Sequence, residues 1–204
     1  EKGTRGHNIS YTYPYGRHTF SFSYQRSKYH QTVESIPYNF ISAGDSNIST
    51  LSWDYVLHRS ASMKTSMDIR LRKRNSHSFL NDVELPIQAM HQTSMEVGFA
   101  ERLYLQRDTL YFRLAHRFGL GWLGAQKEKT YPDAPKTLYR MWLLDVDFVH
   151  PFEFCHRPAT FTTSFHGQYT MDDMRLYGVD MISMGNRYTV RGFDGEVTLM
   201  GTNG

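Results

Sequence analysis

The chain has 204 residues, of which 40% are hydrophobic, 15% aromatic and 21% charged, and its formal net charge is +3 at pH 7. Its mean hydropathy is −0.55, and no stretch approaches the roughly 20 consecutive apolar residues of a membrane helix, which excludes a helical membrane protein. The mild, scattered positive charge argues against nucleic-acid binding, and a single cysteine, Cys155, excludes an intrachain disulfide and a cysteine-rich metal site.

Apolar and polar residues alternate with period two along most of the chain, and this period predicts β-strands. Tyrosine and phenylalanine supply most of the aromatic content, and both favour strands. The N-terminal segment, for example, places Ile9, Tyr11 and Tyr13 on one face. The expected strands cover residues 7–13, 17–29, 48–58, 63–75, 88–100, 109–118, 140–150 and 159–169. The sequence therefore predicts an all-β, antiparallel protein with about eight strands, each close to the length that crosses a bilayer obliquely.

The connections between these expected strands alternate in length. Short connections are expected near residues 14–17, 59–62, 101–108 and 151–158. Long connections are expected at residues 31–47, 76–87, 119–138 and from 170 onward. This asymmetry is typical of up-and-down transmembrane barrels, which have tight periplasmic turns and longer outer loops.

The polar faces of the expected strands carry full charges. An unpaired charge in a dry protein core costs several kcal/mol, so these faces must contact water, and the apolar faces then need lipid or a second sheet. A soluble antiparallel sandwich or barrel with its aromatic residues inside is the alternative that alternation leaves open. In the membrane interpretation, the residues expected to face a water-filled lumen are Asp54, Asp68, Arg70, Arg72, Glu96, Arg113, Arg117, Asp145 and Asp147.

One loop near the C-terminus carries the most specific signal. Residues 185–196 read Gly-Asn-Arg-Tyr-Thr-Val-Arg-Gly-Phe-Asp-Gly-Glu. Glycines near both ends of this segment permit tight turns. An arginine at the tip of such a loop can bind a carboxylate with two hydrogen bonds. The alternative is a surface hairpin of mixed charge.

The motif Val190-Arg191-Gly192-Phe193, with its flanking residues and the strands before it, resembles the signature loop of the two-partner secretion transporters, the TpsB family. Its extended form is most similar to the CdiB-like and ShlB-like members. The resemblance implies a sixteen-stranded transmembrane barrel, of which this chain is a fragment. Residues 1–169 would supply about the fourth to eleventh strands, and residues 170–204 the long sixth extracellular loop. The POTRA domains, the plug helix and the last strands would lie outside this chain.

The resemblance also implies a function. Such a protein lies in the outer membrane of a Gram-negative bacterium and is a pore, not an enzyme. It exports a large, unfolded exoprotein by type V secretion, such as a haemolysin, an adhesin or a CdiA-like contact-dependent inhibition toxin. It contacts outer-membrane lipid, needs no cofactor and binds no nucleic acid. The family's loop arginine, Arg191 here, reaches an acidic residue on a later strand.

Other functions and sites agree less well with the sequence. A BamA-like insertase shares the fold and an arginine-bearing loop, but the longer loop word favours export. A phospholipase or protease barrel would need a Ser–His pair at one rim, and a passive porin has no reason to carry the Arg191 loop. His150, Cys155 and His156 lack a fourth ligand at zinc spacing, so we expect a turn there and no metal site.

Overall fold

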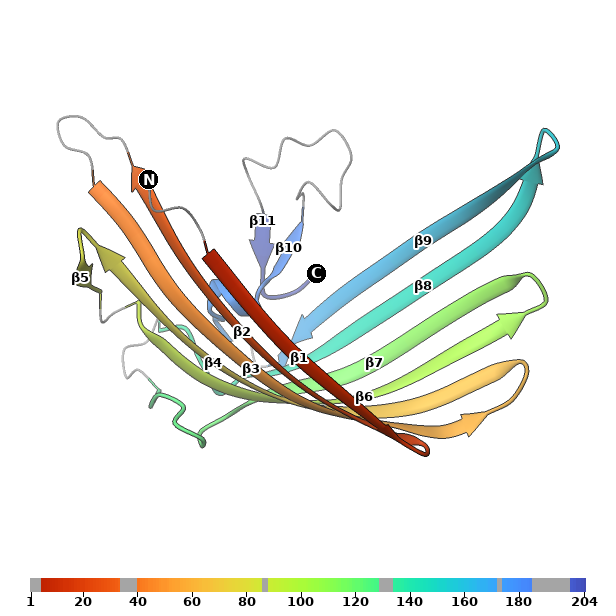
Figure 1. The fold of residues 1–204 in the computed structure, drawn as a ribbon, viewed down its shortest axis with the longest axis horizontal. Helices are drawn as coiled ribbons and strands as arrows, with labels where there is room; N and C mark the ends of the chain where they lie inside the picture. Colours follow the sequence, from red (N-terminus) through yellow and green to blue (C-terminus); the bar gives the residue numbers. More distant parts are fainter. Residues whose placement is uncertain (1–4, 34–39, 86–87, 129–133, 172–173, 185–198) are drawn as a thin grey trace. The chain divides into compact units, whose positions relative to one another are not determined.

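The computed structural model describes residues 5–33, 40–85, 88–128, 134–171, 174–184 and 199–204. Nine strands form one sheet, in which the strands follow chain order except that the short β5 pairs only with β4 (Figure 1). Their bounds are β1 Arg5–Tyr15, β2 His18–Val33, β3 Phe40–Arg59, β4 Met63–Leu80, β5 Val83–Glu84, β6 Met90–Leu105, β7 Asp108–Leu120, β8 Arg140–Phe154 and β9 Arg157–Thr170. A separate antiparallel pair contains β10, Ile182–Met184, and β11, Leu199–Gly201. The expectation of an all-β, antiparallel fold is confirmed.

The chain divides into two compact units. The first contains Glu1–Asp54, Ile69–Met95 and Leu120–Lys127, and the second contains Tyr55–Asp68, Glu96–Gly119 and Glu128–Gly204. Within the described part of the chain, no helix has the length and apolar character needed to cross a membrane.

In the first unit, the register of β1 and β2 separates side chains by type. Residues directly opposite one another in an antiparallel pair share a face, and successive pairs alternate between faces. Tyr11 lies opposite Phe22 on one face, whereas Ser10 lies opposite Ser23 on the other. We call the first of these the apolar face of β1–β2. Its aromatic side chains are exposed, since Tyr11 has an exposed fraction of 66%.

In the second unit, the register of β7, β8 and β9 produces the same separation. Arg113, Asp145 and His166 lie opposite one another across the three strands, and we call their side the charged face of β7–β9. The opposite side, the apolar face of β7–β9, carries exposed rings that include Phe112 and Phe165. The amphipathic alternation expected from the sequence is therefore present in the strands.

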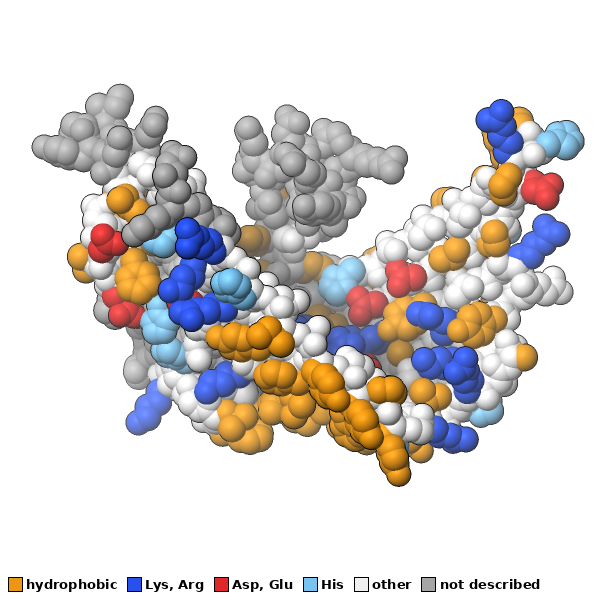
Figure 2. Space-filling model, in the orientation of Figure 1, with side chains coloured by type: hydrophobic (Ala, Val, Ile, Leu, Met, Phe, Trp, Pro, Cys, Tyr) orange, Lys and Arg blue, Asp and Glu red, His pale blue; other side chains and the backbone are white. Residues whose placement is uncertain are grey.

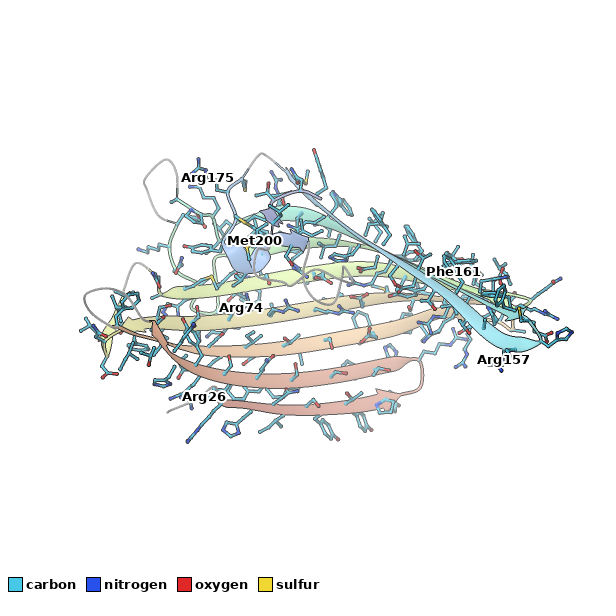
Figure 3. All side chains as sticks on the ribbon, turned by 90° about the horizontal axis from the view of Figure 1, so that it is seen from above. Arg26, Arg74, Arg157, Phe161, Arg175 and Met200 are labelled. Carbon is cyan, nitrogen blue, oxygen red and sulfur yellow. The ribbon has the colours of Figure 1, made fainter. Side chains whose placement is uncertain are left out.

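Several strands are longer than the sequence predicts. The connection expected at 31–47 is wrong in its extent, because β3 begins at Phe40. The link expected at 151–158 is also wrong, because β8 and β9 continue to the pair Phe154–Arg157. Only Cys155 and His156 remain in that turn, and both have positive φ angles, 51° and 59°, as a tight hairpin turn requires. Figure 3 labels Arg157 and Phe161 at this end of β9.

The main apolar cluster lies on the charged face of β7–β9, a placement that the alternation did not predict. Its buried members are Ala115, Tyr139, Met141, Leu143 and Leu176, with Met174 and Met181 packed against them. Because Ala115 lies opposite Leu143 two residues beyond the Arg113–Asp145 pair, the charged face becomes apolar toward one end. The segment 174–181 covers that end, and this covering allows apolar residues on an otherwise charged face.

Candidate functional site

The motif residues Val190, Arg191, Gly192 and Phe193 lie outside the described residues, which instead show the two stems from which the motif segment leaves and returns. Ile182 in β10 lies opposite Gly201 in β11, and Met184 lies opposite Leu199. A 3-10 helix, Gly178–Asp180, precedes β10. Met200 lies beside this helix (Figure 3), with its Sδ atom 3.8 Å from where a Cβ atom of Gly178 would stand. The ends of the motif segment are thus held together as a hairpin.

Gln168 of β9 anchors both stems of this hairpin. Its side-chain Nε2 donates one hydrogen bond to the carbonyl oxygen of Asp180 (2.9 Å) and one to that of Thr202 (3.1 Å). Its backbone N–H donates to the carbonyl of Gly204 (2.6 Å), whose N–H donates in return to the Gln168 carbonyl (2.9 Å). A primary amide has two N–H donors, so both are used. Asp180, two residues before β10, and Thr202, directly after β11, are thus bound to the same side chain.

A second contact holds the stem that enters the hairpin. The hydroxyl of Tyr139 donates to Asp180 Oδ1 at 3.1 Å, and both residues are buried, with exposed fractions of 1% and 8%. Nearby, the backbone N–H of Lys136 donates to the carbonyl of Arg175 (2.8 Å). The end of the β7–β8 connection is therefore bound to the segment that leads into the motif.

Glu128 organises the β7–β8 connection itself. Its Oε1 accepts hydrogen bonds from the hydroxyl of Thr137 and from the backbone N–H groups of Thr137 and Leu138. Burial raises the pKa of this carboxyl, but these hydrogen bonds outweigh burial and hold its pKa below the ordinary value of 4.5. Gly119 completes the arrangement, because a Cβ atom there would lie 1.7 Å from the carbonyl oxygen of Thr137.

The charged face of β7–β9 carries a network of ion pairs centred on Arg113. Its Nε donates to Asp68 Oδ1 (2.9 Å) and its Nη2 to Asp68 Oδ2 (2.6 Å), which is the two-pronged geometry that guanidinium and carboxylate groups favour. Nη2 also bonds Glu96 Oε1, and Nη1 lies 3.6 Å from Asp145 Oδ2. Arg113, Asp68 and Glu96 have exposed fractions of only 4–5%, so each buried charge is paired, as burial requires.

Two further residues extend this network. Arg117 lies four residues after Arg113 on the same face of β7. Its Nε donates to Glu96 Oε2 at 2.8 Å. His166 of β9 contacts Asp145 Oδ1 through Nδ1. The resulting ionic cluster contains Asp68, Glu96, Arg113, Arg117, Asp145 and His166, contributed by five strands, β4, β6, β7, β8 and β9.

Gly98 makes the bond between Arg113 and Asp68 possible. Strand β6 lies between β4 and β7 in the sheet, so the Arg113 side chain must cross β6 to reach Asp68. A Cβ atom on Gly98 would stand 2.6 Å from Asp68 Oδ1 and 2.7 Å from Arg113 Nη2. The missing side chain of Gly98 therefore provides the space in which the two groups meet.

The structure thus brings together five of the nine residues expected on the polar faces. The other four are half-buried within strands: Asp54 in β3, Arg70 and Arg72 in β4, and Asp147 in β8. Asp147 lies opposite Tyr111, two residues from Asp145 on the same face. Asp145 and Asp147 do not form a carboxylate pair that is free for acid–base chemistry, because Asp145 is bound to Arg113 and His166.

Sequence reasoning missed Gly98, His166, Gln168 and the Tyr139–Asp180 contact. His166 and Gln168 lie on the polar side of the alternation in β9, so their face was accessible from the sequence. Their partners were not, because those partners are distant in the chain. The turn expected around His150, Cys155 and His156 is present in its last two residues. His150 Nδ1 lies 2.6 Å from Asp108 Oδ1, and the described residues contain no group of three metal-ligating side chains.

Comparisons with known proteins match this chain to one family. All 204 residues, 1–204, match the family described as "Haemolysin secretion/activation protein ShlB/FhaC/HecB". The outer membrane transporter CdiB-2 of Burkholderia pseudomallei is 32% identical over 203 residues, which cover 99% of this chain and 34% of that protein. The hemolysin transporter protein HpmB of Proteus mirabilis is 26% identical over 204 residues, 98% of this chain and 36% of that protein.

Two solved structures are similar along nearly the whole chain. CdiB from Escherichia coli superposes with a TM-score of 0.90 at 27% identity, over 98% of this chain and 36% of that one. CdiB from Acinetobacter baumannii superposes with a TM-score of 0.84 at 31% identity, over 98% of this chain and 35% of that one. The chain spans about a third of the length of the curated relatives that it matches.

Proposed function

Because the chain belongs to the ShlB/FhaC/HecB family of haemolysin secretion/activation proteins, we propose that it forms part of the wall of an outer-membrane β-barrel that exports a large partner protein. The route is two-partner secretion, and the location is the outer membrane of a Gram-negative bacterium. The exported partner is a CdiA-like toxin or a haemolysin, which crosses the barrel unfolded.

One observation carries the proposal: the two faces of β7–β9 have opposite chemistry, and each is suited to a different solvent. The apolar face leaves Phe165 and Trp142 with exposed fractions of 58% and 41%. A soluble protein rarely exposes so continuous an apolar surface, whereas a barrel presents this face to lipid. The charged face then borders an aqueous lumen, where an unfolded chain keeps its backbone groups solvated.

The nine charged residues named from the sequence are proposed to line that lumen. Support comes from the ionic cluster, because each of its charged side chains is paired with another member of the cluster. No single charge of the cluster would therefore bind a passing polypeptide strongly. A wall of paired charges offers a passing polypeptide polar contacts without one dominant binding site. The motif arginine Arg191 is proposed to lock its loop by binding an acidic residue elsewhere in the full-length protein.

The relatives do not favour the alternatives. Those that match are named as transporters, not as insertases, so we do not retain the BamA-like function. The family is one of secretion proteins, and we propose no catalytic activity.

The test uses the full-length gene together with that of its exoprotein partner. Exoprotein outside the cell and barrel in the outer membrane are measured for the wild type, Arg191→Ala and the control Arg187→Ala in the same loop. We expect Arg191→Ala alone to reduce export strongly at an equal barrel level. Loss of the barrel together with export would make Arg191 a folding residue only. Absence of export from the wild type would contradict the function itself.

A further inference from the structure

The apolar face of β1–β2 changes from apolar to basic along its length. The tight turn at Gly16 and Arg17 joins the two strands at one end, and the basic residues lie at the other end. Counted from the turn, the pairs on this face are Tyr15–His18, Tyr13–Phe20, Tyr11–Phe22, Ile9–Tyr24, His7–Arg26 and Arg5–Lys28. Figure 2 shows blue side chains gathered at this end, beside the orange band that follows the strands toward the turn. We call Arg5, His7, Arg26 and Lys28 the basic patch.

Among the described residues, the ion pairs of the basic patch involve a single carboxylate, that of Asp45. Arg26 Nη2 and Lys28 Nζ lie 3.1 and 3.4 Å from the same oxygen, Oδ2 of Asp45 in β3. Arg5 lies directly opposite Lys28, and like charges in that position destabilise a strand pair. Arg26 and Lys28 thus share one carboxylate, and Arg5 adds a third positive charge beside Lys28. The side chains of Arg26 and Lys28 are 44% and 49% exposed, so a ligand can reach them.

The position of the patch along the strands matches the level of lipid headgroups. His7 lies eight residues from Tyr15, which corresponds to about 27 Å along a strand and about 21 Å along the membrane normal at a tilt of about 40°. The apolar band of a transmembrane barrel is about 25 Å tall. If Tyr15 marks one boundary of this band, the basic patch lies at the opposite boundary, where the headgroups begin.

A cavity adjoins the patch on the same unit. Its volume is about 270 Å³, and its lining includes Lys28, His30, Asp45, Phe79 and Asp82. Lys28 can bind a phosphate group, and the carboxylates of Asp45 and Asp82 can accept hydrogen bonds from sugar hydroxyls, so this space suits a phosphorylated sugar better than a bare ion. Arginine and lysine side chains both bind phosphate oxygens strongly.

We propose that the basic patch binds the phosphate groups of an outer-leaflet glycolipid headgroup, as in lipid A of lipopolysaccharide. The inference rests on the proposed function, because that function places the apolar face against lipid and the long connections outside the cell. Bound phosphate offsets the repulsion between Arg5 and Lys28 and fixes the height of β1 and β2 in the membrane.

The test measures lipid binding to the purified full-length protein by native mass spectrometry. The probes are bisphosphorylated lipid A, the same lipid after removal of its phosphates, and inorganic phosphate. The test variant is Arg5→Gln/Arg26→Gln/Lys28→Gln. The matched control, Arg59→Gln/Arg107→Gln/Arg157→Gln, removes three cations at the tight-turn ends of other strands.

We expect wild type and control to bind bisphosphorylated lipid A alike, and the test variant to bind it on the order of 100-fold more weakly, since each basic residue contributes about fivefold. The single variant Lys28→Gln, with an expected loss of about fivefold, serves if the triple variant does not fold.

Equal binding by wild type and test variant, or equal binding of the dephosphorylated lipid, would overturn the inference. Inorganic phosphate binding as tightly as the lipid would overturn the lipid assignment in favour of a free-phosphate site. Export is scored separately, so a wild type that binds lipid but exports nothing would contradict the proposed function alone.

Discussion

Arg113 and Asp68 form a two-pronged ion pair, with Nη2 and Oδ2 2.6 Å apart, although their strands, β7 and β4, are not neighbours in the sheet. The side chains meet across Gly98 of the intervening strand β6. A sheet normally couples each strand to its two neighbours through the backbone. This contact couples strands two apart, and it does so with side chains on the charged face.

Gly98→Ala should break this coupling. The new methyl group would stand within 3 Å of both charged partners, and overpacking of this kind costs about 1–3 kcal/mol. Folding of the full-length barrel, followed by urea unfolding and by the gel mobility shift between folded and heated samples, measures the loss. Gly6→Ala in β1 is the matched control, because its nearest contact would be an ordinary 3.8 Å. Equal stability of Gly98→Ala and Gly6→Ala would contradict the role of Gly98.

Removal of Arg113 alone should cost more than its removal together with Asp68 and Glu96, its two most buried partners. Arg113→Met leaves Asp68 and Glu96 buried without their principal cation, and breaking a buried pair in this way costs about 3–5 kcal/mol. The triple variant Arg113→Met/Asp68→Leu/Glu96→Gln removes the stranded charges and should recover part of that loss. A double-mutant cycle between Arg113 and Asp68 should give a coupling energy of about 1–3 kcal/mol. Additive losses would show that the pair is not energetically linked.

The sequence predicts the strands and their faces well, and the reason is local. A period of two depends only on adjacent residues, so the apolar face with Tyr11 and Phe22 is readable from the chain alone. The alternation is weakest where strands leave the apolar band, as at Gly44–Asn47, and those residues read as a loop although they lie in β3. There the backbone ladder continues without an apolar face to mark it.

The contacts that define the site could not be read in the same way. The role of Gly98, which is to leave space for the Arg113–Asp68 pair, can be recognised only when the order β4-β6-β7 in the sheet is known. Met141 and Leu143 lie on the charged face and are buried by Leu176, which is more than 30 residues away in the chain. Gln168 has the parity of a polar-face residue, but its partners Asp180 and Thr202 become its neighbours only through the hairpin.

The Glu128 contacts should weaken in acid. The folded carboxyl has a pKa below its ordinary value of 4.5, so its stabilisation is fully present above that value and is lost as the pH falls through the lowered folded pKa. The backbone amides of Thr137 and Leu138 donate hydrogen bonds to Glu128. Their hydrogen-exchange rates are measured in the wild type and in Glu128→Gln at each pH. We expect stronger protection in wild type at a pH above 4.5, and convergence of the two proteins only once the pH has fallen below the lowered folded pKa. A difference that is constant with pH would contradict the assignment.

Gln168→Glu should loosen the root of the motif hairpin. The amide donates to two carbonyl oxygens, those of Asp180 and Thr202, and a carboxylate in its place has no proton to donate and repels both. Loss of two buried hydrogen bonds with unsatisfied acceptors costs about 1–3 kcal/mol for each group. Trypsin cleavage of the full-length barrel after Arg187 and Arg191, relative to cleavage after the exposed Arg59 at the end of β3, should therefore accelerate, and export should fall. Gln25→Glu, on an exposed stretch of β2, makes the same chemical change away from the hairpin and should alter neither the cleavage nor the export.

Gln168→Met removes the donors without adding a charge, so an intermediate effect is expected from it. If all three variants were cleaved and exported like the wild type, the motif segment would be held by contacts other than Gln168.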